Sequence, residues 1–370
     1  MSKRQLSMVM DLNKCIGCQT CTVACKTQWT NRNGREYMYW NNVETYPGTG
    51  YPKNWMDLGG GFDAAGDLQE GVIPNIEADY GVPWDFNYDE SRDGKQLVAD
   101  SQPVWGPNWD EDVGEGNFPS DNYFFYIPRI CNHCDNPGCL SACPRDSIFK
   151  REEDGVVLVD LDRCQGYRYC IAGCPYKKIY FNPKISKSEK CILCFPRVEQ
   201  GLPPACSQQC VGRIRFVGFR DDEEGQIHKL VDQYKVALPL RSDYGTQPNI
   251  FYIPPTESPA KFDANGKIIE GSTRVPEEEL VKLFGEAVIP AIKTIKEGIA
   301  AKAAGKESEL MDILIAYKHS DMFRLDNDYY QSIAHENERK PLPTVDERYI
   351  VGKNTPKVKH FSLSSHGGHH

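Results

Sequence analysis

Fifteen cysteines in a chain of 370 residues fall into four tight runs, and no other feature of the sequence constrains the fold as strongly. The runs are Cys15, Cys18, Cys21 and Cys25; Cys131, Cys134, Cys139 and Cys143; Cys164, Cys170 and Cys174; and Cys191, Cys194, Cys206 and Cys210. Disulfides explain them poorly, because the spacing within each run is too tight for a disulfide framework and an odd total leaves one thiol unpaired. The cysteines therefore indicate inorganic centres held by short loops.

The first run follows the pattern C-x2-C-x2-C-x3-C, which bacterial ferredoxins use to bind a [4Fe–4S] cluster through thiolates. The third run keeps this spacing, except that Tyr167 stands three residues after Cys164 and three before Cys170. Fifteen thiolates then suffice for three [4Fe–4S] clusters and one [3Fe–4S] cluster. A phenol is a poor ligand for iron, so we expect Tyr167 to be a non-ligand whose ring closes the open corner against iron and water.

The ligand sets are expected to be crossed, because in two-cluster ferredoxins the fourth cysteine of each run binds the other run's cluster. Nesting is the economical pairing: the outer two runs exchange fourth ligands, and so do the inner two. The first set is then Cys15, Cys18, Cys21 and Cys210; the second is Cys25, Cys191, Cys194 and Cys206; the third is Cys131, Cys134, Cys139 and Cys174; and the three-iron set is Cys143, Cys164 and Cys170.

Zinc is the competing interpretation, since Cys-x2-Cys pairs also bind zinc in structural scaffolds. Zinc sites rarely combine three cysteines at two-residue spacing with a fourth cysteine four residues later, so we favour iron–sulfur clusters. Basic residues near the later runs are candidates for raising the reduction potentials of such clusters, with a solvated surface as the alternative; they are Lys177, Lys178, Lys187, Lys190 and Arg197.

Apolar segments next to the runs predict an α+β fold with two ferredoxin-like lobes, each holding two clusters. Strands are expected before the first three runs and after the last one, at 5–12, 123–129, 156–160 and 214–219, with 148–151 and 156–160 forming a hairpin. We expect a lobe of 1–30 and 186–235 with two [4Fe–4S] clusters, an insertion at 31–122, a lobe of 123–185 with one [4Fe–4S] and one [3Fe–4S] cluster, a helical C-terminal region at 236–335, and an extended tail at 336–370.

The insertion is acidic and aromatic, with 16 Asp and Glu against 3 Lys and Arg between residues 51 and 122. We expect it to pack against the second lobe or a partner protein; a self-contained surface loop is the alternative. Its aromatic residues include Tyr37, Tyr39, Trp40, Trp55, Trp84, Trp105 and Trp109.

The C-terminal region carries apolar residues at helical spacing from 276 to 300, which predicts a helix kinked or divided at Pro290, and a second helix is expected at 308–318. The polar tail is expected to be disordered or to dock an additional subunit. Its histidines, His366, His369 and His370, form a weak metal-site candidate beside the simpler interpretation of a solvated terminus.

Several functional classes fit poorly. No apolar stretch reaches the roughly 18 residues of a membrane helix, and the N-terminus lacks the pattern of a secretory signal. The net charge of −9 and the lack of a basic motif argue against nucleic-acid binding. No nucleophile motif stands out, so catalysis by this chain alone is not expected, and His133 is predicted to be a donor or packing residue in a cluster loop.

The cysteine order and long flanking phrases resemble the iron–sulfur beta subunits of the DMSO-reductase-type molybdenum enzymes that include nitrate reductase, nitrite oxidoreductase, ethylbenzene and dimethylsulfide dehydrogenases, and selenate, chlorate and perchlorate reductases. The resemblance covers roughly residues 3 to 325. Matching phrases include Asn13–Cys21, Tyr39–Thr45, Asn108–Asp112, Cys131–Cys134, Ser188–Cys191, Val236–Leu240 and Phe251–Pro255. Formate dehydrogenase and polysulfide reductase subunits usually carry sixteen cysteines, so Tyr167 argues against them.

The resemblance implies an electron-transfer subunit between a catalytic alpha subunit, which holds a molybdenum bis-MGD cofactor, and a haem b gamma subunit. It also implies the nested ligand pairing, with the first set nearest the molybdenum and the three-iron set nearest the haem. Co-export with the alpha subunit implies a periplasmic location; the nitrate reductase branch is instead cytoplasmic and membrane-associated. The resemblance favours nitrite, nitrate or chlorine oxyanion chemistry of the complex; the alternatives are a hydrocarbon or dimethylsulfide dehydrogenase, a selenate reductase, or a formate dehydrogenase-like complex.

Overall fold

The computed structural model describes residues 4–81, 114–256, 259–326 and 328–332. All fifteen cysteines lie within these ranges. Trp84, Trp105, Trp109 and the tail with its three histidines lie outside them, so the predictions for those residues are not addressed by the structure.

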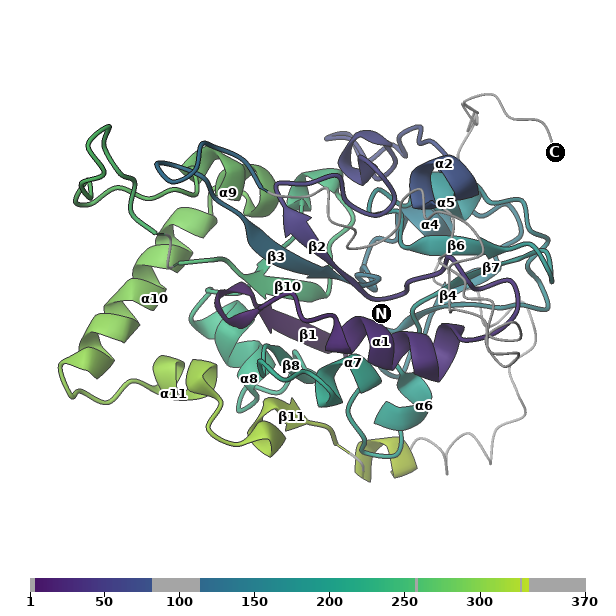
Figure 1. Cartoon of the computed structure of the whole chain (residues 1–370). Coiled ribbons are helices and arrows are strands. Elements are labelled where there is room, and N and C mark those ends of the chain that lie inside the picture. Colours follow the sequence, from purple (N-terminus) through teal and green to yellow (C-terminus); the bar gives the residue numbers. More distant parts are fainter. Residues whose placement is uncertain (1–3, 82–113, 257–258, 327, 333–370) are drawn as a thin grey trace, which may run out of the picture.

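A five-stranded sheet occupies the centre of the molecule (Figure 1), in the order β11 (Phe323–Arg324), β8 (Arg215–Phe219), β1 (Leu6–Asp11), β10 (Ile250–Ile253) and β9 (Leu238–Pro239). β1 pairs antiparallel with β8 and parallel with β10. Every residue of β1 is buried, as expected for a central strand covered on both faces. The strands predicted at 5–12 and 214–219 are confirmed.

The other strands of the described residues form three antiparallel pairs: β2 with β3, β4 with β5, and β6 with β7. The β4–β5 pair confirms the predicted hairpin, and β2, from the insertion, pairs with the strand predicted before the second cysteine run. Their bounds are β2 Asn42–Tyr46, β3 Phe125–Arg129, β4 Ile148–Lys150, β5 Val157–Val159, β6 Ile179–Asn182 and β7 Lys187–Lys190.

Short helices carry or adjoin most of the cysteines. They are α1 (Thr20–Cys25), α4 (Gly138–Ser141), α5 (Tyr169–Gly173), α6 (Phe195–Val198) and α7 (Ala205–Gln208). Further short elements are η1 (Leu12–Lys14), η2 (Lys26–Thr30), η3 (Trp55–Asp57), α2 (Ile76–Tyr80), α8 (Gln226–His228), η4 (Lys229–Gln233), η5 (Ser242–Tyr244) and η6 (His319–Met322).

The predicted helix at 276–300 is divided, but not at Pro290. α9 (Glu277–Phe284) ends at Gly285, whose φ of +75° is a left-handed conformation that favours glycine, and α10 (Val288–Ala303) follows. Pro290 lies in the first turn of α10, where backbone N–H groups have no partner within the helix, so its missing N–H costs nothing. The second predicted helix is α11 (Glu309–Ile315), capped by the Ser308 side chain.

The C-terminal region is not only helical, which corrects the prediction. In Figure 1, α9 lies above the sheet, α10 to its left and α11 at the lower left, while β9, β10 and β11 from the same region are strands of that sheet. The run Ile250–Ile253 is short, apolar and fully buried, which is typical of a central strand. Sequence reasoning missed it because a run of four residues has no periodicity.

One continuous hydrophobic core includes cysteines of both predicted lobes, among them Cys21, Cys131 and Cys206. The division into two lobes therefore stays a prediction. The described part of the insertion packs against the rest of the chain: Trp40 and Trp55 are buried in this core, and the Gly61 N–H donates to Gly173 O at 3.1 Å. Within the described residues, no helix combines the length and the apolar character needed to cross a membrane.

Candidate iron–sulfur cluster sites

The four cysteine loops share one backbone feature. The residue just before the second ligand position is left-handed in each of them, with φ of +66° at Gly17, +43° at His133, +71° at Gly166 and +48° at Leu193. Tyr167 therefore follows the same turn as the second cysteine of the other three runs. At this position the third loop has a tyrosine side chain instead of a cysteine, while its backbone forms the same turn.

Two cavities are each lined by four cysteines. One of about 360 Å³ is lined by Cys131, Cys134, Cys139 and Cys174, and one of about 290 Å³ by Cys25, Cys191, Cys194 and Cys206. These are the third and second predicted sets, and each cavity takes cysteines from two runs, as crossed ligation requires. The chain brings these segments together by placing α4 against α5 and α1 against α7.

The first set lies nearer the surface. Cys18 is exposed, whereas Cys21 is buried beside Arg215. Burial, with smaller contributions from the neighbouring thiols Cys21 and Cys210, raises the pKa of Cys15 to about 11. The structure therefore brings Cys15, Cys21 and Cys210 close to one another, with Cys18 toward solvent.

The three-iron set is also assembled from two runs. Burial raises the pKa of Cys170 to about 12, with Cys143 and Cys164 as neighbouring thiols that add to the shift. The Ser188 N–H donates to Cys164 Sγ at 3.5 Å, and the Ser147 N–H donates to Cys143 Sγ at 3.4 Å. Tyr167 is 53 % exposed, so its ring can cover this site only from the solvent side.

Hydrogen-bond donors in the cavity walls lack an acceptor, and the inorganic sulfides of a bound cluster would accept from them. Trp40 lines the cavity of the second set, and its buried Nε1 has no hydrogen-bond partner in the described structure. His133 lines the cavity of the third set; its Nδ1 accepts from the Val157 N–H at 3.1 Å, which places the proton of the neutral ring on Nε2, an atom also without a partner. Trp29 Nε1 donates to Cys194 Sγ at 3.0 Å.

Three buried lysines supply positive charge around the same cavities. Lys177, Lys178 and Lys190 are fully buried, and within the described residues none of them forms a salt bridge with a carboxylate. Burial lowers the pKa of Lys178 to about 7 and that of Lys177 to about 8, while the Glu44 carboxylate and cysteine thiolates near Lys178, and the Cys174 thiolate near Lys177, oppose the shift. Buried cations need anionic partners, and bound thiolate clusters would supply them.

The solvated-surface interpretation is therefore wrong for these three lysines, whereas Lys187 and Arg197 are partly exposed.

For zinc, four sulfurs must lie about 2.3 Å from one ion. Among the described residues, no three His, Cys, Asp or Glu side chains come close enough to hold a single ion.

Sequence reasoning missed several residues that contact the sulfurs, among them Trp29, Ser188 and Arg215. For Arg215 a signal exists: it is the lone charged residue in the otherwise apolar strand 214–219. Trp29 and Ser188 carry no comparable signal, because their contacts depend on how distant loops pack.

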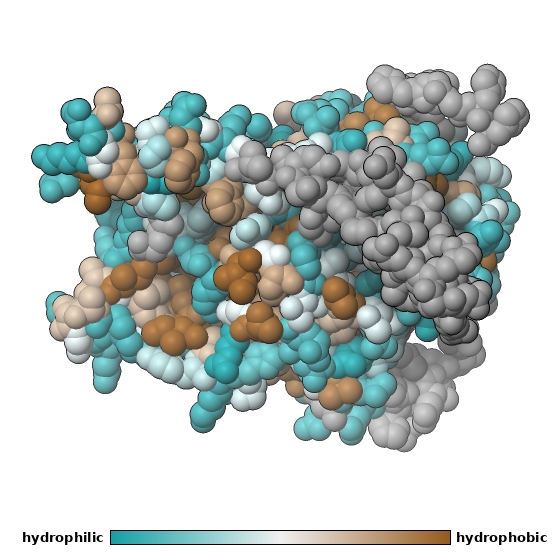
Figure 2. Space-filling model, viewed as in Figure 1, coloured by the Kyte–Doolittle hydropathy of each residue, from teal (hydrophilic) through white to brown (hydrophobic). Residues whose placement is uncertain are grey.

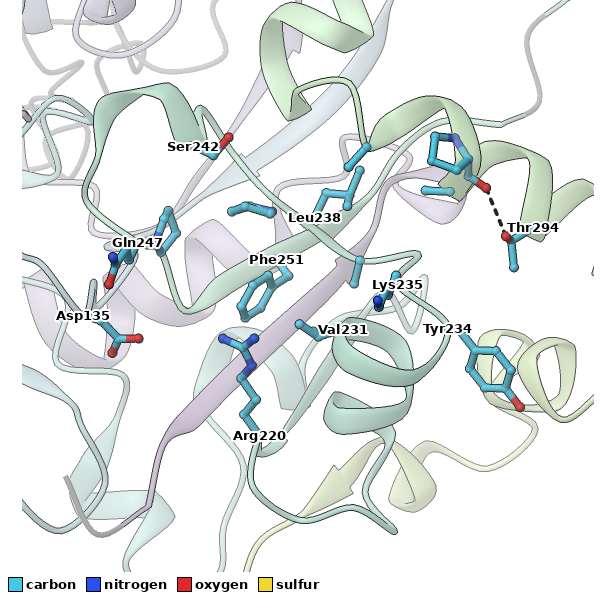
Figure 3. A pocket seen from close by; sticks show the side chains of 16 residues that line it. Asp135, Arg220, Val231, Tyr234, Lys235, Leu238, Ser242, Gln247, Phe251 and Thr294 are labelled. Atoms are coloured by element: carbon cyan, nitrogen blue, oxygen red, sulfur yellow. Dashed lines mark hydrogen bonds between the residues drawn. The ribbon is translucent and has the colours of Figure 1, made fainter. Parts of the chain in front are cut away.

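A larger cavity of about 1380 Å³ has no cysteine in its lining. Figure 3 shows Arg220 beneath the Phe251 ring near its centre and Asp135 at one side. Asp232 holds the Arg220 guanidinium through two hydrogen bonds of 3.0 and 2.7 Å. Its lining is unsuited to an iron–sulfur cluster because it offers no thiolate.

Gly17 is expected to be required for the first cluster. A Cβ at Gly17 would stand 2.6 Å from the Tyr126 ring, and its φ of +66° already disfavours other residues. We expect Gly17→Ala to lower the iron content by about four atoms per chain, because the turn that holds Cys15 and Cys18 would shift. Iron quantification against protein checks this.

Gly66→Ala is the matched control, since Gly66 has a φ of +86° but nothing within 4 Å of an added Cβ. Equal iron loss in both variants would show that backbone strain rather than the Tyr126 contact is responsible. Unchanged iron in Gly17→Ala would contradict the prediction.

Comparison with known proteins agrees with this geometry. A 4Fe-4S dicluster domain family matches residues 122–220, and a 4Fe-4S binding domain family matches residues 6–27. The chain is 60 % identical to dimethylsulfide dehydrogenase subunit beta of Rhodovulum sulfidophilum, over 88 % of this chain and 100 % of that protein. It is 58 % identical to selenate reductase subunit beta of Thauera selenatis, over 87 % and 99 % of the two chains.

Chlorate reductase subunit beta of Ideonella dechloratans is 57 % identical, over 87 % of this chain and 99 % of that protein. Identity at this level over nearly whole chains establishes common ancestry, and the matched domain families are those of iron–sulfur proteins. The chain belongs to the family of iron–sulfur beta subunits of the DMSO-reductase-type molybdenum oxidoreductases, which transfer electrons for a separate catalytic subunit.

Proposed function

We propose that this chain holds three [4Fe–4S] clusters and one [3Fe–4S] cluster in the four ligand sets, and relays electrons between a catalytic molybdenum subunit and a haem b subunit. The observation that carries the proposal is the pair of buried cavities, each lined by four cysteines and bordered by buried cations. When bound, the clusters supply one-electron carriers. The chain's own residues hold them, exclude water and set the charge around them.

Iron quantification together with electron paramagnetic resonance tests the cluster count. The anaerobically purified protein should contain about fifteen irons per chain and show the signal of an oxidised three-iron cluster before reduction. About sixteen irons without that signal would mean that a fourth ligand completes the cluster at Tyr167, and a colourless protein would point to zinc.

We propose that the catalytic subunit docks over the first set, as the family resemblance implies. Cys18 is exposed there, and three aliphatic side chains of neighbouring segments face solvent: Ile16 at 66 %, Val211 at 63 % and Val23 at 61 % exposure. Figure 2 shows apolar surface near the centre of the face, where α1 and its preceding loop lie in Figure 1. Exposed apolar surface beside a redox centre suits a protein interface that excludes water.

Charged substitutions in this patch should break the complex. We expect Ile16→Asp with Val211→Asp to reduce co-purification of the catalytic subunit at least tenfold, because two desolvated carboxylates would face an apolar partner surface. Ile268→Asp is the control, since Ile268 is 55 % exposed on a separate loop. Iron content should stay unchanged in both proteins; retention of the complex by the double variant would refute this docking face.

The haem b subunit is proposed to dock at the three-iron set. Exposed Tyr167, Leu161 and Ile185 lie in the segments around Cys164, at 53 %, 40 % and 47 % exposure. Loss of haem b from the purified complex after Leu161→Asp, with the catalytic subunit retained, is the expected result. Loss of both partners together would contradict separate docking faces.

The substrate is proposed to be a nitrogen or chlorine oxyanion, with dimethylsulfide or selenate as the second candidate. The second candidate is favoured by the identities of 60 % and 58 % to a dimethylsulfide dehydrogenase and a selenate reductase subunit. Assays of the whole complex with each compound decide between them.

The protein is also proposed to reach the periplasm by co-export with the catalytic subunit, which cell fractionation tests. The tail is proposed to dock an additional subunit, which deletion of the tail tests.

A further inference from the structure

Arg215 is the first residue of β8 and is fully buried, at 0 % exposure. β8 pairs with β1, where Arg215 lies opposite Met10 at the end of the paired stretch, so the side chain starts from the edge of the sheet where the two strands stop pairing. A guanidinium in such a place is always charged, and a buried charge is costly unless anions surround it.

The guanidinium contacts sulfurs of two different ligand sets. Arg215 Nη2 lies 3.3 Å from Cys21 Sγ, which belongs to the first set, and Nη1 lies 3.6 Å from Cys206 Sγ, which belongs to the second. Cys21 is carried by α1 and Cys206 by α7, so one side chain from the sheet spans the two cysteine helices.

No carboxylate balances this charge within the described part of the chain. The other partners are neutral: Nη2 donates to Asn41 Oδ1 at 2.7 Å, and Nη1 lies 3.8 Å from Met8 Sδ. Burial alone would lower the pKa of Arg215, but nearby thiolates, with Cys21 and Cys206 foremost, raise it above its usual value. The anions that match Arg215 are thus the cysteine sulfurs of both sets.

Arg129 provides an instructive contrast. It is as deeply buried as Arg215, but its Nη2 lies 2.7 Å from the Glu44 carboxylate, and its other partners are backbone carbonyls. Its charge is neutralised locally by a carboxylate, whereas the charge of Arg215 is left for the clusters.

We propose that Arg215 places one fixed positive charge between the first and second ligand sets and raises the reduction potentials of both bound clusters together. Nearby charge and hydrogen bonds to the ligating sulfurs favour the reduced, more negative form of an iron–sulfur cluster. Because the same guanidinium contacts both sets, neither potential can be changed through Arg215 without changing the other. The inference rests on the proposed function, since it requires both clusters.

The test is a redox titration of the complete complex followed by electron paramagnetic resonance, with iron quantified for each protein. In Arg215→Met, two of the four midpoint potentials should fall, and at a fixed ambient potential the oxidised-to-reduced ratio of each should rise at least tenfold. For a one-electron couple a tenfold change is about 59 mV. Arg215→Lys keeps the charge and should restore most of the shift in both clusters, which a purely structural role does not predict.

Asn41→Asp is a second variant that leaves Arg215 in place. Its carboxylate would partly neutralise the guanidinium, so the same two potentials should fall, and this result decides the matter if Arg215→Met fails to assemble. The double variant Arg129→Met with Glu44→Gln, which removes a neutral buried pair, should leave all four potentials unchanged.

A shift in one cluster only, in none, or equally in all four would overturn the proposal while leaving the proposed function intact. A wild-type complex without four titrating clusters would instead overturn the proposed function itself. The two failures are therefore distinguishable.

Discussion

Replacing Tyr167 by cysteine should convert the proposed three-iron cluster into a fourth [4Fe–4S] cluster. The third loop already has the turn of the other three, with Gly166 left-handed as Gly17 is in the first loop. Cys18, at the corresponding place, is exposed, and Tyr167 is half-exposed, so a thiol there would have the same access to the site. We therefore expect the variant to gain about one iron per chain and to lose the oxidised three-iron signal.

Tyr167→Ser is the matched control, because it removes the ring without supplying a thiolate. It should keep about fifteen irons and the three-iron signal. If Tyr167→Cys also keeps that signal, the loop does not hold a fourth ligand near the cluster, and the proposed reason for three irons is wrong. Gain of a fourth iron in Tyr167→Ser would show that the ring alone excludes it.

Loss of the third cluster should unfold the protein, whereas loss of the first should not. Cys139 is buried in α4, packs in a small hydrophobic cluster with Ile148 and Ile171, and lines the cavity of about 360 Å³. A cluster held by the third set would tie Cys139 of α4 to Cys174 at the end of α5, so its loss would release buried segments that the metal centre holds together. The buried Lys190 near Cys139 would also lose its anionic partner.

We expect Cys139→Ala to yield less than about a tenth of the wild-type amount of folded protein, because binding of the metal centre is coupled to folding. Cys18→Ala is the comparison, since Cys18 lies at the surface and its loss leaves no buried void. That variant should accumulate with about four irons fewer per chain. Yield after anaerobic purification and circular dichroism measure the effect; equal yields would show that the third cluster is not a folding element.

The local features of the chain were predictable from the sequence. The strands at β1, β3 and β8 and the β4–β5 hairpin lie where short apolar segments flank the cysteine runs. The second and third cysteine sets were predicted by letting pairs of runs exchange their fourth ligands in a nested order. Cysteines so close together in the sequence leave few ways to bind one cluster. The position of the break between α9 and α10 was predicted wrongly, since Pro290 was weighed as a helix breaker and Gly285 was not.

Other features depend on contacts between distant segments. β10 lies beside β1 although about 240 residues separate Met8 from its partner Ile250, and no local pattern encodes that pairing. The burial of Lys177, Lys178 and Lys190 was also not foreseeable. The residues around a lysine near a cysteine run do not show whether its side chain faces water or the core.

The sequence by itself indicated the kind of centre and predicted its ligands and the one non-cysteine position, because ligand type and spacing are local covalent properties. Only the tertiary structure decided which charges face the sulfurs. Arg215 reaches Cys21 and Cys206 because β8 contacts α7, which packs against α1, and burial there removes the water that would otherwise screen its charge.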